Sequence, residues 1–224
     1  MRYRVEPKPF RYVSIPKTAP TKAQYVKHDV QKDLTGRLEL NLQVVSEYLF
    51  VGSGNYDFQN KLVYYSFFRN NGNLAIPSTS IKGAVRSVVE AISNSCASQL
   101  ASKKKTGPNR YKPDEKNYIY KKHTHFPCKD ISELCIACRL FGSADYGGRA
   151  GFSDALPLEK PSVEIVKIGE LFAPTIVRND KRKFYQNKTF KSIGNLKPEK
   201  NYRFVEAVKK GGKFKTVMSF YNIV

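Results

Sequence analysis

The chain has 224 residues, of which 39 are Lys or Arg and 19 are acidic, so that its formal net charge is +20. An apolar share of 41% is enough for a buried core, whereas the sequence has no run of about 18 apolar residues that would predict a transmembrane helix. The charged, proline-bearing N-terminus lacks the apolar stretch of a signal peptide, and we expect a cytoplasmic protein with no membrane partner. So large an excess of cations favours nucleic acid as the partner.

Aromatic side chains are frequent, with 14 Tyr and 14 Phe but no Trp. Several stand among basic residues, a combination that suits unstacked bases and their phosphates. For any single ring, packing is the more common role. The clusters are Phe10-Arg11-Tyr12, Phe68-Arg69, Arg110-Tyr111-Lys112 and Lys183-Phe184-Tyr185.

In chain order, residues 1–35 contain four prolines and predict an extended N-terminal arm. The alternation of polar and apolar residues from Arg37 to Val44 then predicts a half-buried strand that ends near Val51. Residues 52–76 predict a protruding β-hairpin, because an aromatic run at 63–68 is followed by a turn-like, asparagine-rich segment.

The best helix signal starts at Pro77, which is followed by hydroxyl residues. Apolar residues recur at helical spacing from there and predict a helix over about residues 79–101. The polar segment from Lys103 to Lys122 predicts a flexible insertion, and residues 174–202 predict irregular structure. Further strands are expected at 150–155, 162–168, 203–208 and 213–223. One helix among mostly antiparallel strands predicts the α+β class.

A cluster of cysteines predicts a metal site. Cys128, Cys135 and Cys138 fall within eleven residues, and two of them are separated by only two residues. Three thiols with a nearby imidazole suit tetrahedral zinc, with His125 as the fourth ligand. His123 and Cys96 are the alternative fourth ligands. A redox dithiol and three unrelated thiols are the competing interpretations, the first of which lacks a βαβ context.

The predicted helix start, Ser78 to Arg86, is a candidate phosphate site. Backbone N–H groups at a helix N-terminus are unpaired, and the helix dipole is positive there. Lys82 adds a full charge, Gly83 permits close approach of a backbone, and Arg86 lies one turn further on the same face. An ordinary capped helix with a solvated basic face explains the spacing equally well.

Catalytic groups are scarce in this sequence. It has three histidines, His28, His123 and His125, and two of these are candidate metal ligands. Asp57, in the loop predicted after the first strand, is the candidate carboxylate for metal-dependent RNA cleavage. A single carboxylate in a loop is more often simply solvated, so Mg²⁺ is expected only if the chain cleaves RNA.

Several motifs together resemble the RAMP proteins of CRISPR–Cas systems. They are, in order, Gly52-Ser53-Gly54 after a strand, the segment from Ile76 to Arg86, Cys135-x2-Cys138-Arg139-Leu140-Phe141-Gly142, and Gly151-Phe152-Ser153-Asp154-Ala155. The resemblance covers about residues 36–224. It implies a ferredoxin-like (RRM-related) core, a β-hairpin thumb at about 52–76 and a zinc-binding insertion at about 102–142.

The resemblance also implies a function. Backbone subunits of type III CRISPR effectors polymerise along guide RNA, grip its phosphates and displace bases with the thumb for target recognition. The implied partners are therefore crRNA, target RNA and other type III subunits. The implied RNA-binding residues are Ser53, Arg69, Ser78, Ser80, Lys82, Gly83, Arg86, Arg139 and Arg149.

Two features differ from the family pattern. Subunits that cleave target RNA carry an aspartate in the thumb shortly before a step equivalent to Arg69-Asn70, and the stretch from Val63 to Phe67 has no acid. We therefore expect RNA binding without cleavage; the alternative is a metal-dependent endoribonuclease that uses Asp57. The family usually continues with a glycine-rich loop and another strand beyond the segment that ends at Val224.

The missing end predicts either that a neighbouring chain completes the sheet or that the chain is a shortened subunit, a fragment, or half of a split or fused protein. The N-terminal arm resembles that of larger type III-D-like proteins. A guide-processing ribonuclease that uses a histidine is a further alternative, and so is a zinc-dependent nucleic-acid-binding protein outside CRISPR systems.

Overall fold

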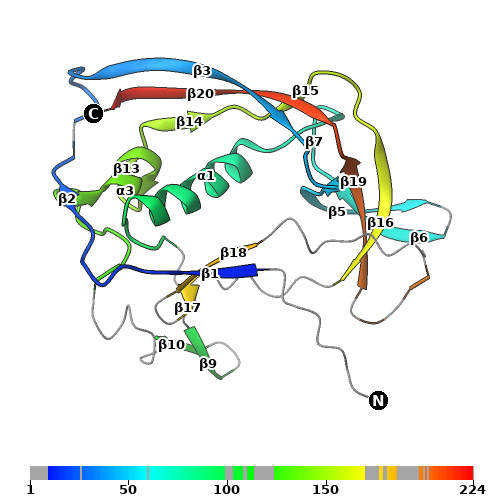
Figure 1. The fold of residues 1–224 in the computed structure, drawn as a ribbon, viewed down its shortest axis with the longest axis horizontal. Helices are drawn as coiled ribbons and strands as arrows, with labels where there is room; N and C mark the ends of the chain where they lie inside the picture. Colours follow the sequence, from blue (N-terminus) through cyan, green and yellow to red (C-terminus); the bar gives the residue numbers. More distant parts are fainter. Residues whose placement is uncertain are drawn as a thin grey trace.

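The structure is a computed structural model that describes residues 10–25, 27–59, 61–98, 103–107, 110–113, 124–169, 177–178, 181–185, 197–198, 200 and 202–223. Within these residues the fold is mostly β, with one long helix, α1 (Ser78–Ile92), and a short one, α3 (Ile136–Phe141). The predicted α+β class is confirmed only in part: helices and strands are both present, but strands make up most of the regular structure. Figure 1 shows α1 beneath a long pair of strands, with a second group of strands at one end. No helix in the described part is long and apolar enough to cross a membrane.

The long pair consists of β3 (Leu34–Gln43) and β20 (Lys213–Ile223), which run antiparallel along almost their whole length. This confirms the strand predicted at 213–223 and the one predicted from Arg37, although β3 ends at Gln43 and not near Val51. β14 (Ala150–Phe152) and β15 (Leu156–Pro157) pair with the opposite edge of β20. The alternation in β3 turns Leu42 toward a core that contains Phe67 and Phe214.

The second group of strands forms a sheet in the order β16 (Val163–Gly169), β19 (Tyr202–Lys209), β6 (Leu62–Phe67) and β5 (Gly52–Gln59). β4 (Tyr48–Leu49) also pairs with β19. β19 passes directly into β20 of the first sheet through a turn in which Gly211 has a φ of 93°. That left-handed conformation suits glycine and matches the turn predicted from Lys210-Gly211-Gly212.

Smaller sheets attach the remaining described segments. The described part of the predicted N-terminal arm lies along the rest of the chain, because β1 (Phe10–Ser14) pairs with β18 (Lys181–Tyr185) and β2 (Lys22–Ala23) pairs with β11 (Leu134–Cys135). The other short pairs are β17 (Val177–Arg178) with β18, β7 (Arg69–Asn70) with β8 (Asn73–Leu74), β9 (Lys103–Gly107) with β10 (Arg110–Pro113), and β12 (Gly142–Ser143) with β13 (Tyr146–Gly147). The prediction of irregular structure at 174–202 is therefore wrong for β17 and β18, and the segment predicted as a flexible insertion contains the strands β9 and β10.

Helix α1 ends nine residues before the predicted residue 101 (101 − 92 = 9). Asn94 has a φ of 45°, a left-handed conformation that Asn tolerates and that stops the helix. The sequence keeps an apolar residue at helical spacing as far as Cys96, although the helix itself ends at Ile92. The face of α1 that packs consists of Ile81, Val85 and Val89. The predicted hairpin at 52–76 forms two hairpins, β5–β6 and the short β7–β8.

Candidate metal centre and nucleic-acid interface

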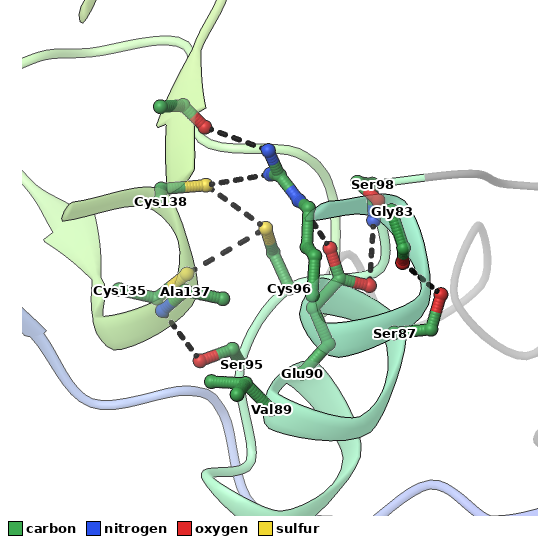
Figure 2. A network of polar contacts seen from close by, with 12 residues as sticks. Gly83, Ser87, Val89, Glu90, Ser95, Cys96, Ser98, Cys135, Ala137 and Cys138 are labelled. Atoms are coloured by element: carbon green, nitrogen blue, oxygen red, sulfur yellow. Dashed lines mark hydrogen bonds and ion pairs between the residues drawn. The ribbon is translucent and has the colours of Figure 1, made fainter. Parts of the chain in front are cut away.

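Four cysteines from distant parts of the sequence meet near the end of α1. Cys96 follows α1, Cys128 lies in the loop before α3, and Cys135 and Cys138 stand at the start of α3. Their sulfur atoms all lie within 4.8 Å of one another, with 3.3 Å between Cys96 and Cys138 and 3.6 Å between Cys96 and Cys135. All four are buried and none forms a disulfide. Figure 2 shows Cys96 between Cys135 and Cys138.

The donor set fits a structural zinc ion. With Zn–S bonds of about 2.3 Å, the sulfur atoms of a tetrahedral site lie ~3.8 Å apart, close to the observed separations. Hydrogen bonding to Cys128 lowers the pKa of the Cys135 thiol and raises the pKa of the Cys96 thiol, so the four groups differ in acidity without a metal. A divalent cation would hold all four as thiolates. Four protein ligands leave no open position, so zinc would stabilise the fold here and bind no substrate.

His125, which was expected first as the fourth ligand, lies outside the cysteine cluster. Its ring nitrogens contact Asn94 Oδ1 at 2.8 Å and Thr124 Oγ1 at 3.0 Å. Cys96 takes the fourth position instead. This corrects the prediction, and the reason is the early end of α1, which lets Cys96 turn toward Cys138. The other alternative, His123, lies outside the described residues.

A buried ion network adjoins the four thiols. Glu90 of α1 is 3% exposed and pairs with Arg86 at 2.8 Å and with Arg182 of β18 at 3.3 Å. Arg86 also donates to Gly142 O at 2.9 Å and to Cys138 Sγ at 3.6 Å. Burial opposes the charge of Arg86, but the hydrogen bond to Glu90 raises its pKa above the usual value. Arg86 thus ties α1 to the cysteine cluster.

The charge balance of this network also suits zinc. Four thiolates around one Zn²⁺ carry a net charge of −2, and two guanidinium groups beside one carboxylate carry +1. Buried charge is costly unless it is compensated, and each group here lies next to its opposite. The hydrogen bond from Arg86 to Cys138 Sγ places a positive charge directly beside one of the four thiols.

The start of α1 is capped by the chain itself. Ser78 N donates to Asp154 Oδ1 at 2.7 Å, and the backbone N–H groups of Ser80 and Ile81 donate to Pro77 O. The hydrogen bond from Ser78 N holds the pKa of the Asp154 carboxyl below its usual value. The N–H groups of Ser78, Ser80 and Ile81 are therefore already paired, and they are not free to bind the phosphate that was predicted there. Asp154 comes from a sequence motif far from the helix, which explains why the cap was missed.

Three of the predicted RNA contacts stand in the first two turns of α1, where Ser80 and Lys82 point to different sides because they are two residues apart. Ser80 and Gly83 are exposed, and Lys82 is half-buried. A Cβ built on Gly83 would meet no atom within 4 Å, so the space above it is open. Ser78, the first residue of α1, is half-buried.

The other predicted RNA contacts have protein partners. Arg69 forms two hydrogen bonds with Glu206, at 2.6 and 2.8 Å, and holds the pKa of that carboxyl below its usual value against the opposing effect of burial. Ser53 Oγ contacts Ser66 Oγ at 2.8 Å. Arg149 is 6% exposed and donates to the hydroxyl of Tyr146 at 2.6 Å.

Arg139 differs from these. It lines a cavity of about 130 Å³ together with Arg149 and Tyr146. Its Nε is buried and has no hydrogen-bond partner. Among the described residues, no other buried side-chain nitrogen or oxygen atom lacks a partner. Contact between Arg139 and RNA therefore remains a prediction, and Nε of this side chain is a donor without a protein partner.

The candidate catalytic residue, Asp57, lies in strand β5 and not in a loop. Its carboxylate accepts hydrogen bonds from Tyr64 Oη at 3.1 Å and from Phe58 N at 2.7 Å. Burial, and then this contact, raises the pKa of Tyr64. Among the described residues, the four cysteines are the one group of three or more metal-binding side chains that converge, and Asp57 is not part of it.

Sequence reasoning missed Glu90, Arg182, Asp154 and Glu206. The pair Arg86–Glu90 was readable, since residues four apart face each other on a helix. No local signal points to the pairing of Glu90 with Arg182, because 92 residues separate them.

Comparison with known families identifies the chain. A profile described as the RAMP superfamily matches residues 41–223. The chain belongs to the RAMP superfamily. In this RAMP protein the family-like motifs make contact with one another: Ile76 bridges Ala155, Ser78 bonds Asp154, and Arg86 bonds Gly142.

Two solved structures are similar to this RAMP protein in fold. One is a chain in the cryo-EM structure of the type III-B Cmr-beta bound to cognate target RNA, with 15% identity, a TM-score of 0.42 and coverage of 84% of this chain and 47% of that chain. The other is Cmr6 from Pyrococcus furiosus, with 18% identity, a TM-score of 0.36 and coverage of 83% of each chain. The chain thus spans about half the length of the first. No curated protein has a significant sequence match.

Proposed function

We propose that this RAMP protein is an RNA-binding backbone subunit of a type III CRISPR effector, which acts in the cytoplasm and holds crRNA for target RNA recognition beside other subunits. The observation that carries the proposal is the net charge of +20 on a chain whose RAMP match extends over residues 41–223. A polyanion offsets such an excess of cations, and phosphate contacts supply most of non-specific RNA affinity. The type III-D-like subtype belongs to the same proposal.

The proposal extends to the parts of the fold. The sheets with α1 represent the ferredoxin-like core over about residues 36–224, and the β5–β6 hairpin represents the thumb. The four cysteines hold zinc, which fixes the segment before α3 to the end of α1. Residues 1–35 remain the proposed arm and 102–142 the proposed insertion.

The phosphate contact centres on Lys82 with Ser80 and Gly83. Lys82 is followed directly by Gly83, above which the space is open, whereas Arg86 and Arg69 are held by Glu90 and Glu206. A half-exposed lysine beside an open glycine suits a phosphate that approaches the helix surface. Among the predicted cations, Lys82 and Arg139 are thus the ones with capacity for RNA.

Replacing Lys82 by alanine is expected to weaken binding of single-stranded RNA by a similar factor for every sequence. Because one phosphate contact is lost, the slope of log affinity against log salt should fall by about 0.7–1. The measurement is a fluorescence-anisotropy titration at several salt concentrations with two RNAs of different sequence.

Lys160→Ala provides the control, because that exposed lysine lies in the loop between β15 and β16 and its loss changes the net charge equally. A slope that falls as much in Lys160→Ala as in Lys82→Ala would show only a general charge effect. A loss confined to one RNA sequence would contradict the phosphate contact.

The second candidate function is cleavage of target RNA with Mg²⁺ held by Asp57. Its support is the position of Asp57 on the hairpin proposed as the thumb. Two observations argue against it: Asp57 contacts Tyr64, and among the described residues no further acids converge on it. We expect that the assembled complex with Asp57→Asn cleaves labelled complementary RNA no less than the complex with the unmodified chain. Metal-dependent cuts at regular spacing that disappear in Asp57→Asn would establish this subunit as the nuclease.

A further inference from the structure

One face of the β5–β6 hairpin carries exposed rings. Tyr56 is 62% exposed and Phe58 is 64% exposed, and their partners across the hairpin are Tyr65 and Val63. Because side chains alternate along a strand, these four residues share one face, which we call the aromatic face. Asp57 lies on the opposite face, so the nearest acid of the hairpin points away from it.

The rings of the aromatic face are held in place before any ligand binds. Tyr56 and Tyr65 stack at 4.2 Å between ring centroids with an angle of 38°, and their hydroxyl groups are hydrogen-bonded. The guanidinium of Arg203 lies 5.7 Å from the Tyr65 ring and donates to its hydroxyl at 3.3 Å. An aromatic surface ordered in this way, with a cation at its border, loses little freedom when a flat ligand stacks on it.

Charge indicates which ligand this surface suits. Arg203 and the exposed Lys61 in the hairpin turn border the aromatic face, and the whole chain carries a net charge of +20. A second copy of so basic a chain is repelled, whereas a strand of RNA brings both phosphates for the cations and bases for the rings. Strand β5 is also the edge of its sheet, so nothing in the described sheet lies beyond it.

We infer that the aromatic face binds unpaired bases of single-stranded RNA by stacking. The inference rests on the proposed function and adds that the bases, and not only the phosphates, contribute to affinity. Stacking tolerates any base, because every base has a flat face, so no sequence preference follows.

The test compares two single-stranded probes of equal length and charge, about 12 nucleotides long, one with bases and one built from abasic sugars. The full chain should bind the base-bearing RNA more tightly than the abasic strand. Tyr56→Leu combined with Phe58→Leu should weaken binding of the base-bearing RNA by about tenfold or more and leave binding of the abasic strand unchanged. The salt slope should stay the same, since no phosphate contact is lost.

Tyr202→Leu is the control, because that ring is 38% exposed on β19 and the alternation along the strand places it on the face opposite to Arg203. An equal loss in Tyr202→Leu would overturn a specific stacking site, as would a double variant that binds both probes like the unmodified chain. If the unmodified chain binds both probes equally, stacking is excluded while RNA binding stands. If it binds neither, the proposed function itself fails. Self-association that the double variant abolishes, with RNA binding intact, would assign the face to a second copy.

Discussion

Replacing Cys96 by serine is expected to release bound zinc and to unfold a large part of the domain. The four sulfur atoms lie within 4.8 Å of one another, and a structural zinc in such a site contributes about 10 kcal/mol or more of apparent folding free energy. That contribution is comparable to the whole stability of a typical domain, about 5–15 kcal/mol. Elemental analysis of the purified chain measures zinc content, and thermal unfolding measures stability.

The control for this prediction is His125→Gln. His125 hydrogen-bonds to Asn94 and not to the thiols, so this variant should keep its zinc while Cys96→Ser loses it. If Cys96→Ser does not fold, a chelator titration of the unmodified chain still tests the site, because removal of zinc should lower the melting temperature. An unmodified chain purified without zinc, or zinc lost from His125→Gln alone, would refute the four-thiol site.

Replacing Glu90 by glutamine is expected to cost about 3–5 kcal/mol of unfolding free energy, because it leaves the buried guanidinium of Arg182 and the partly buried one of Arg86 without their carboxylate. Arg182 and Glu90 are both 3% exposed, so water cannot replace the lost pair. The measurement is chemical denaturation with excess zinc, so that metal occupancy stays constant. Because the network is buried, the loss should persist at high salt.

Glu39→Gln is the matched control, since it removes the same charge from an ion pair with Lys215 in which both side chains are largely exposed. An exposed pair of this kind contributes little, and the variant should unfold almost like the unmodified chain. Equal destabilisation in the two variants would mean that Glu90 acts only through the net charge of the chain. An undiminished stability of Glu90→Gln would show that the arginines are compensated elsewhere.

Much of the local structure was predictable because it depends on neighbours in the sequence. The alternation from Arg37 to Val44 specifies a strand, since it places apolar residues on one face. The start of α1 at Pro77–Ser78 was likewise readable from the proline and the hydroxyl residues. The end of α1 was not readable, because the apolar spacing continued past Asn94 although the backbone did not.

The candidate sites show a similar division. The spacing of Cys128, Cys135 and Cys138 was enough to predict a metal site, since three thiols so close in sequence reach one ion. The fourth thiol, on Cys96, lies 42 residues before Cys138, and nothing local distinguishes it from His125. For Arg86, its place beside Lys82 suggested a phosphate contact, whereas its partners in the fold are Glu90, Gly142 and Cys138.

The sequence by itself therefore determined the strongly basic character of the chain, the long strands of its two main sheets, the start of its helix and three members of the cysteine cluster. Composition and short-range periodicity carry that information, because they do not depend on which distant segments meet. Only the tertiary structure decided that Cys96 joins the other three cysteines, that Asp154 caps α1, and that the rings of Tyr56 and Tyr65 contact each other on one exposed face. Each of those contacts joins residues whose proximity depends on strand register and helix length, and these are set by the packing of the whole chain.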